Sequence, residues 1–277
     1  METMEIIKEA FIFPSQNIEK LAIYILVTFV LAIFVAGGAI LSVLGVNQSF
    51  YLIFAFILFV LGVVVALIIT GYQVGVLKSG IDHDESAPAF DWKNDFITGL
   101  KMLVLSIVYF IIPFIVTLIM MFVTNIPGQL VNIAQKISVS SANATAVTSS
   151  ASPVLTGVSQ AAMTSLVASM AFTTLVAVMV FIIFAFLHAM GQSRLANTGD
   201  LGEAINIPEA FRDITRIGVG KVIAVIVLVF IIMVVIQGIL AFLYGKVPQL
   251  SILGIIVTPY LAFFIQRAVG LLYSDIA

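Results

Sequence analysis

Two long stretches without a charged side chain constrain this chain more than any other feature. The first lies between Lys20 and Lys78, the second covers residues 137–193, and each contains 57 residues. An α-helix rises 1.5 Å per residue, so about 20 apolar residues cross a hydrocarbon core of about 30 Å. Each stretch is therefore longer than one crossing, and the sequence predicts a chain whose main solvent is lipid.

The composition excludes several classes of protein. Hydrophobic residues make up 62% of the chain and charged residues 9%, which would leave a water-soluble domain with far more apolar surface than water tolerates. The chain has no cysteine, so disulfides, thiolate metal sites and thiol catalysis are excluded. Its 12 basic residues against 14 acidic ones form no basic field, and we expect no nucleic-acid partner.

Polar residues and prolines divide the apolar sequence into six predicted spans, so the expected fold is all-α and integral to the membrane. Polar residues at 47–49 separate the first two spans, and the third ends before the Asn-Ile-Pro-Gly sequence at 125–128. We expect one polytopic domain over residues 1–277, with a cytoplasmic interfacial segment at 1–20 and an extracytoplasmic Ser/Thr-rich loop at 124–160. The spans are expected near residues 21–44, 50–72, 98–123, 161–188, 221–243 and 247–266, the last continuing to residue 273.

The basic residues predict the orientation of the spans. Lys and Arg in short loops bias those loops toward the cytoplasm. Ten of the twelve fall on one side of the predicted spans, and only Lys136 and Lys246 fall on the other. All fourteen acidic residues lie on the basic-rich side, and an even number of spans returns the chain to it. We therefore expect a multi-pass protein of the cytoplasmic membrane with its N- and C-termini in the cytoplasm.

Three segments on that side have the pattern of amphipathic helices lying in the membrane interface. In residues 206–218 four apolar side chains share one face opposite charged ones, and Pro208 suits a first turn. Residues 90–101 and 6–11 show similar spacing. These helices are expected to orient the spans, and a lipid-sensing or partner-docking role is the alternative. The expected interfacial anchors are Trp92, Phe96, Phe211 and Ile214.

Two parts of the chain repeat a common order of features. The second and fourth spans end in similar sequences, Leu-Lys-Ser-Gly at 77–80 and Ala-Asn-Thr-Gly at 196–199. Each is followed by an amphipathic segment, a lysine (Lys101 or Lys221) and another span. Because the second and fourth spans would cross in the same direction, the pattern predicts a duplicated helical hairpin related by an axis along the membrane normal.

Five short segments together resemble a known membrane family. They cover residues 6–14, 71–80, 88–101, 199–204 and 268–273. In these segments the chain resembles the polytopic membrane family catalogued as domain of unknown function 4013, and the resemblance extends over almost the whole chain. Members occur mainly in archaea and have no assigned activity or catalytic residues. The resemblance implies a polytopic architecture and an archaeal cytoplasmic membrane, and it transfers no functional site.

Small side chains recur every four residues along the fourth predicted span, over residues 161–177. Such a ladder lets another helix backbone approach closely, and the alternative is a hydroxyl-lined path for a solute. Ser165, Ser169 and Thr173 are the residues on which this choice depends. Gly71 at the end of the second span is a further candidate for a close helix contact.

Two prolines and one arginine are the other candidates for a solute path. Pro113 and Pro259 interrupt the third and sixth spans, and paired interrupted helices are typical of transporter sites. Pro is nevertheless common in membrane helices. Arg267 is the cation nearest to the hydrocarbon. Its side chain is expected to snorkel toward the cytoplasmic headgroups, and binding of an anion is the alternative.

Candidate catalytic and metal-binding motifs are weak. The acidic sequence Asp-His-Asp-Glu at residues 82–85 lacks the spacing of a calcium loop, so we expect a solvated turn and leave cation binding open. His188 has no acidic or cysteine partner nearby in the sequence, and Gly-Val-Gly-Lys at 218–221 fails as a phosphate-binding loop. Asn143 fits a glycosylation acceptor. We expect no enzymatic activity, no catalytic residue, no metal and no cofactor.

Two classes of function remain. The favoured one is a non-enzymatic membrane-organising or partner-scaffolding protein, because the sequence combines an amphipathic cytoplasmic side with packing ladders and lacks charge inside the spans. The alternative is a passive or facilitated transporter of a small neutral or weakly anionic solute. The expected partners are the lipid bilayer and either a second copy of the chain or an unidentified membrane protein.

Overall fold

The computed structural model describes residues 1–43, 47–144 and 159–277, and within these ranges every element is a helix. Six helical segments are long and apolar enough to cross a membrane, which confirms the expected all-α class and the number of spans. They are α2 (Ile18–Val43), α3 (Gln48–Ile81), α4 (Trp92–Val123), α6 (Gln160–Thr198), α9 (Val219–Lys246), and η1 (Pro248–Leu253) with α10 (Gly254–Tyr273).

Four shorter helices complete the described chain: α1 (Thr3–Gln16), α5 (Ile126–Ala144), α7 (Leu201–Ala204) and α8 (Ile207–Ile217). Helix α8 confirms the helix expected at residues 206–218. Asn206 caps it by accepting a 3.3 Å hydrogen bond from the Glu209 backbone N–H, and Pro208 lies in its first turn.

The prediction of a loop at residues 124–160 is wrong for the first half of that range, because the first half contains α5. Helix α4 ends at Val123, and Asn125 turns the chain with a φ of 52°. Pro127 then falls in the first turn of a new helix, where its missing N–H costs nothing. Residues 145–158 of the expected loop, and the side chain of Asn143, lie outside the described residues.

The second, third and fourth spans extend further toward the charged end than the sequence suggested, and α6 ends at Thr198 where residue 188 was expected. Helix α3 continues nine residues beyond the expected end at residue 72, to Ile81. The amphipathic segment expected at residues 90–101 is no separate helix, because α4 runs from Trp92 into the span without interruption. No proline lies between Trp92 and the apolar sequence that begins at Met102, and the one glycine there, Gly99, does not end the helix.

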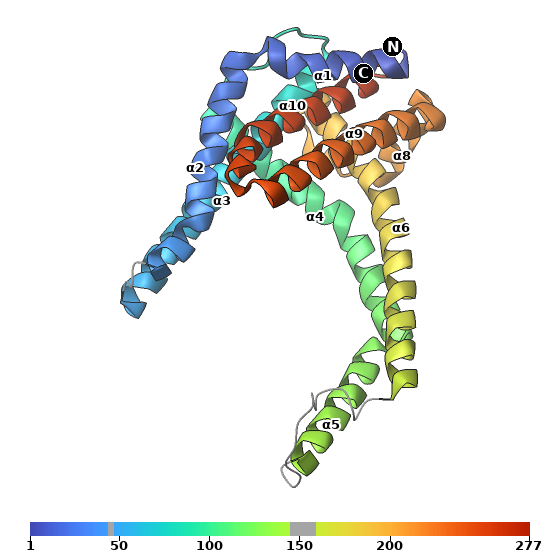
Figure 1. Cartoon of the computed structure of the whole chain (residues 1–277). Helices are drawn as coiled ribbons and strands as arrows, with labels where there is room; N and C mark the ends of the chain where they lie inside the picture. Colours follow the sequence, from blue (N-terminus) through green and yellow to red (C-terminus); the bar gives the residue numbers. More distant parts are fainter. Residues whose placement is uncertain (44–46, 145–158) are drawn as a thin grey trace. The chain divides into compact units, whose positions relative to one another are not determined.

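The chain folds into two compact units. Unit 1 comprises Met1–Ile107 and Phe186–Ala277, and unit 2 comprises Val108–Ala185. In unit 1, α10 packs against α1, α2 and α3 (Figure 1). The two ends of the chain lie together there, since the amine of Met1 is 3.3 Å from the carboxylate of Asp275.

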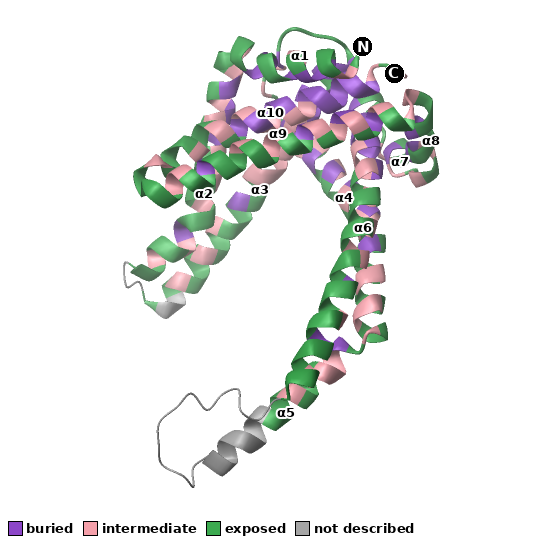
Figure 2. Ribbon diagram, turned by 45° about the vertical axis from the view of Figure 1, so that its right-hand side comes forward, coloured by how far each residue is buried: buried purple, intermediate pink, exposed green. Residues whose placement is uncertain are grey.

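The core of unit 1 lies where α1, α2, α3 and α10 meet. Figure 2 shows buried residues gathered on α1, α10 and the adjacent end of α3, whereas the opposite end of the α2 and α3 hairpin is mostly exposed or half-buried. Aromatic rings fill this core: Tyr24 meets Phe263 edge-on at 5.2 Å between centroids, and Tyr72 stacks on Phe90 at 3.7 Å.

Glycines let α3 approach its neighbours closely. A Cβ on Gly71 would lie 1.8 Å from the backbone oxygen of Asp95, and one on Gly99 would lie 1.9 Å from the backbone oxygen of Leu67. The two contacts are reciprocal, so α3 and α4 touch backbone to backbone within unit 1. Close approach through small residues is the usual way to pack helices in lipid.

Candidate functional site

Arg267 is the centre of a buried polar junction in unit 1. It lies on α10 and is 2% exposed, with its guanidinium 4.4 Å from the ring centroid of Phe13. Its Nη1 donates to the backbone oxygens of Ser79 at 2.7 Å and Asp84 at 2.6 Å, and its Nη2 donates to the Glu9 carboxylate at 2.7 Å. The side chain therefore ties α1, α10 and the end of α3 together.

The chemistry of this junction follows from where α3 ends. The last four carbonyls of a helix have no partner inside the helix, and they carry the negative end of its dipole. Ser79 supplies one of these carbonyls, which accepts from the Asp84 N–H at 2.8 Å and from the charged guanidinium of Arg267 at 2.7 Å. The expectation that Arg267 snorkels toward the headgroups is therefore wrong, because its charge is neutralised inside the protein by Glu9.

A polar cavity of about 610 Å³ adjoins Arg267 between α1 and the loop after α3. Asn17 fixes its wall: the side-chain amide donates to the Glu85 carbonyl at 3.0 Å, and its oxygen accepts from the Ala87 N–H at 2.7 Å. In the acidic sequence at 82–85, Asp82 pairs with Lys78 at 3.0 Å. Among the described residues, no three His, Asp or Glu side chains lie where they could hold one metal ion.

A second buried charge, Asp213, holds α8 against the rest of unit 1. Asp213 is 1% exposed and lies 2.9 Å from Arg194 and 3.3 Å from Arg216, and the hydroxyl of Tyr273 donates to it at 3.3 Å. The sequence pattern placed Asp213 on the charged face of an amphipathic helix, opposite the apolar one. That placement missed that Asp213 faces the half-buried Arg194, so the face of α8 that packs against the rest of unit 1 carries a charge.

The four expected interfacial anchors differ in exposure. Trp92 is 53% exposed and Phe211 is 59% exposed, so both present an aromatic surface. Phe96 is half-buried, and Ile214 is buried against the rest of unit 1. Trp92 and Phe211 thus have the exposure that contact with a membrane interface requires, whereas Ile214 holds α8 in place. Whether these helices lie in the interface stays a prediction.

In unit 2 the small-residue ladder of α6 meets hydrogen-bonding partners. Gln129 on α5 donates to the Ser169 hydroxyl at 2.9 Å and accepts from the Ser165 hydroxyl at 3.2 Å. Thr173 lies 3.0 Å from Thr124, hydroxyl to hydroxyl. The hydroxyls of Ser165, Ser169 and Thr173, on which the choice between helix packing and a solute path depends, are thus all hydrogen-bonded to residues outside α6. The partners Gln129 and Thr124 were not singled out from the sequence.

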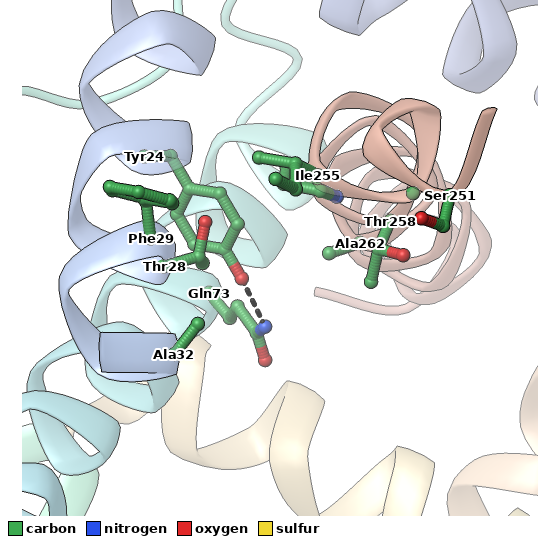
Figure 3. A pocket seen from close by; sticks show the side chains of 11 residues that line it. Tyr24, Thr28, Phe29, Ala32, Gln73, Ser251, Ile255, Thr258 and Ala262 are labelled. Atoms are coloured by element: carbon green, nitrogen blue, oxygen red, sulfur yellow. Dashed lines mark hydrogen bonds between the residues drawn. The ribbon is translucent and has the colours of Figure 1, made fainter. Parts of the chain in front are cut away.

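The prolines that interrupt two spans belong to different units. Pro113 is buried in unit 2, where its carbonyl accepts a 2.8 Å hydrogen bond from the Thr117 hydroxyl. Pro259 belongs to unit 1 and lines a cavity of about 400 Å³ between α2, α3, η1 and α10 (Figure 3). In that cavity the amide of Gln73 donates to the Tyr24 hydroxyl at 2.6 Å.

Sequence reasoning did not find the Gln73 and Tyr24 pair. Gln73 carried one usable signal, since an amide side chain inside a long apolar span is costly unless it finds a partner. Tyr24 carried none, because a tyrosine near the end of a span is common in the interfacial aromatic belt. Its partner on another span became visible only in the folded chain.

Comparison with known proteins gives one match. The family model described as "Protein of unknown function (DUF4013)" matches residues 54–245, which is more than half of the chain. No curated protein matches this chain, and no solved structure does. The residues matched run from the second span to the fifth.

Proposed function

Because the chain belongs to the DUF4013 family of proteins of unknown function, and the family brings no activity with it, we propose a function from the geometry of this multi-pass membrane protein. We propose that it is a non-enzymatic protein that organises the membrane or scaffolds partner proteins within it. The observation that carries the proposal is how little of each span is covered by the rest of the chain.

The spans leave most of their apolar surface uncovered. In the most apolar window of each of the first five spans, only between 11% and 22% of the residues are buried, against 39% in the sixth. Large side chains such as Phe56 on α3 and Phe230 on α9 are 67% and 65% exposed. In a membrane such surface contacts lipid or other helices, so this chain offers an extensive surface to both.

The polar contacts support the same function. Every ion pair among the described residues belongs to unit 1, as does the Arg267 junction. Packing at this charged end holds the spans while leaving their apolar flanks open, as a scaffold requires. Of the features that suggested transport, Arg267 is neutralised by Glu9, and Ser165, Ser169 and Thr173 take part in helix contacts.

Photo-crosslinking from the spans tests the scaffold directly. A photoreactive phenylalanine analogue is placed at Phe56, at Phe230, or at the fully buried Phe263, and membranes containing the protein are irradiated. We expect Phe56 and Phe230 to give defined adducts with lipid, a second copy or another membrane protein, and Phe263 to react only within its own chain. The scaffold is contradicted if the exposed positions also react only within the chain.

Solute flux in proteoliposomes tests the alternative. Purified protein is reconstituted, and uptake of small neutral and monoanionic solutes is compared with uptake by empty vesicles. The scaffold predicts no difference. Saturable uptake that Ser169→Leu or Ala262→Trp abolishes would overturn it in favour of a facilitator, because these substitutions fill the α6 hydroxyl face and the cavity at Pro259.

We further propose the orientation that the basic residues predict, with both termini in the cytoplasm of the cell that makes the protein. Because the chain has no cysteine, a single introduced thiol reports its own accessibility. Ser159→Cys, at the exposed start of α6, should react with an impermeant thiol reagent added outside, and Thr215→Cys on α8 should not. The reverse labelling pattern would contradict this orientation.

A further inference from the structure

The cavity between α2, α3, η1 and α10 combines an apolar wall with the polar pair of Gln73 and Tyr24, and three hydroxyl residues, Thr28, Ser251 and Thr258, also line it. Its volume is about 400 Å³, and its apolar lining includes Phe29, Ile255 and Pro259. Phe29 and Ile255 are 46% and 38% exposed, so the cavity opens on the apolar flank of the spans. Figure 3 shows Gln73 and Tyr24 side by side at this cavity, joined by their hydrogen bond.

The polar pair offers both a donor and an acceptor. The Gln73 amide nitrogen donates to the Tyr24 oxygen, which leaves the Tyr24 hydroxyl hydrogen and the Gln73 carbonyl oxygen available. Pro259 has no N–H, so the carbonyl of Ile255, four residues earlier in α10, lacks its helical partner at the same cavity. A neutral hydroxyl group, which donates and accepts at once, matches this arrangement.

The depth of the pair selects against charged ligands. Tyr24 is four residues beyond the charged Lys20, about 6 Å along the helix axis, and Gln73 is five residues before Lys78, about 8 Å. Charged Glu19 and Lys20 mark the end of α2. The residues that line the cavity are uncharged, so a phosphate drawn to this depth would find no counter-charge.

We propose that this cavity binds a neutral lipid with a free hydroxyl group, such as a diacylglycerol or a long-chain alcohol. The hydroxyl donates to the Gln73 side-chain oxygen and accepts from the Tyr24 hydroxyl, and the hydrocarbon chain leaves past Phe29 and Ile255 into the bilayer. The proposal does not depend on the scaffold function, and either can fail alone.

Photolabelling of the full chain in bilayer nanodiscs tests the site. The probe is a sixteen-carbon primary alcohol carrying a photoreactive and an alkyne group on its chain, and its methyl ether and phosphate monoester serve as comparisons. We expect the alcohol to label peptides around Phe29 or Ile255 saturably. The ether, which cannot donate, and the phosphate, which is charged, should each label this site at least tenfold more weakly at equal concentration.

Variants identify the groups that bind. Tyr24→Phe keeps the ring and removes the hydroxyl, Gln73→Leu removes the amide, and Ala262→Trp fills the cavity, so each should weaken labelling about tenfold or more. Gln129→Leu removes an amide of α5 in unit 2 and should leave labelling unchanged. Equal labelling by alcohol and ether on the native chain, stronger labelling by the phosphate, or labelling elsewhere in the chain would overturn the proposal. The comparison of the alcohol, ether and phosphate probes uses the native chain, so its outcome does not depend on whether any variant folds.

Discussion

The two units of the molecule hold their helices together by different polar chemistry. Unit 1 uses buried charges, with Arg267 paired to Glu9 and Asp213 paired to Arg194. The described part of unit 2 uses neutral groups, in which Gln129 bonds two serines of α6. The difference follows the sequence, because the charged residues gather near the helix ends of unit 1, whereas α6 carries no charged side chain from Gln160 to Ser193.

The largest effect is expected when one member of the Arg267 and Glu9 pair is removed. Arg267→Met keeps much of the side-chain volume but removes the guanidinium that donates to the Asp84 carbonyl and to the Glu9 carboxylate. Breaking a fully buried ion pair costs about 3–5 kcal/mol, and because Glu9 is 38% exposed while Arg267 is 3% exposed, we expect a loss near the lower end of that range. Chemical unfolding in detergent micelles measures the loss.

Arg212 supplies the matched control for that experiment. It also pairs with a glutamate, Glu209, but its side chain is 64% exposed. An exposed pair contributes about 0–1 kcal/mol, so Arg212→Met should change the free energy of unfolding little. Equal losses in the two variants would show that burial does not distinguish the junction from a surface pair.

The next effect concerns backbone packing in unit 1. Gly71→Ala places a methyl group within 1.8 Å of the Asp95 oxygen, so α3 and α4 must move apart. We expect a loss of about 1–3 kcal/mol in the free energy of unfolding, as for other overpacked contacts. Gly238→Ala is the control, since its Cβ meets nothing within 4 Å and alanine favours the helix. A loss at Gly238 as large as at Gly71 would refute the close contact.

The spans were predictable from the sequence because hydrocarbon length and apolar composition decide them. Uncharged stretches of 57 residues leave few alternatives, and prolines and polar corners placed the divisions to within a few residues at most ends. Helix α5 was missed because the Ser- and Thr-rich sequence from residue 138 was extended back over it, although Ile126, Leu130 and Ile133 recur at helical spacing and Pro127 marked its first turn.

The candidate site was less predictable, because it depends on pairs far apart in the sequence. Arg267 was recognised as unusual, yet its partner Glu9 lies 258 residues away and nothing local indicates the pairing. Gln73 and Tyr24 are likewise 49 residues apart on different spans. A sequence shows which side chains need a partner, and only the packed helices show which partner each one receives.

A smaller effect is expected for the neutral contacts of unit 2. Gln129→Leu removes both hydrogen bonds to the α6 serines while keeping an apolar side chain of similar size. Hydrogen bonds between membrane helices contribute about 0.6 kcal/mol on average and up to about 1.7 kcal/mol, so the loss should fall in that range. The same unfolding assay measures it, with Asn132→Leu on the exposed side of α5 as control. A loss comparable to that of Arg267→Met would abolish the contrast between the units.

The smallest effect concerns pH and the chain ends of unit 1. Burial alone would raise the pKa of Asp275, but hydrogen bonds from Lys221 and the Met1 amine outweigh it and hold the pKa below its ordinary value. Because the pKa of this carboxyl group is lower in the folded chain than in the unfolded chain, where it is about 3.9, its charge stabilises the folded state at pH values above about 3.9. This contribution is lost as the pH falls through the pKa of the folded chain.

Melting temperatures measured between pH 7 and pH 3 test this sign. The native chain should exceed Asp275→Asn in stability by about 1 kcal/mol or less at neutral pH, as partly exposed pairs do, and the gap should close as the carboxylate of the native chain is protonated. A gap that widens on acidification would contradict the direction of the shift. Asp275 is only partly buried, whereas Arg267 is buried. Comparing Asp275→Asn with Arg267→Met therefore tests whether the large effect predicted for Arg267 comes from burial or from charge pairing alone.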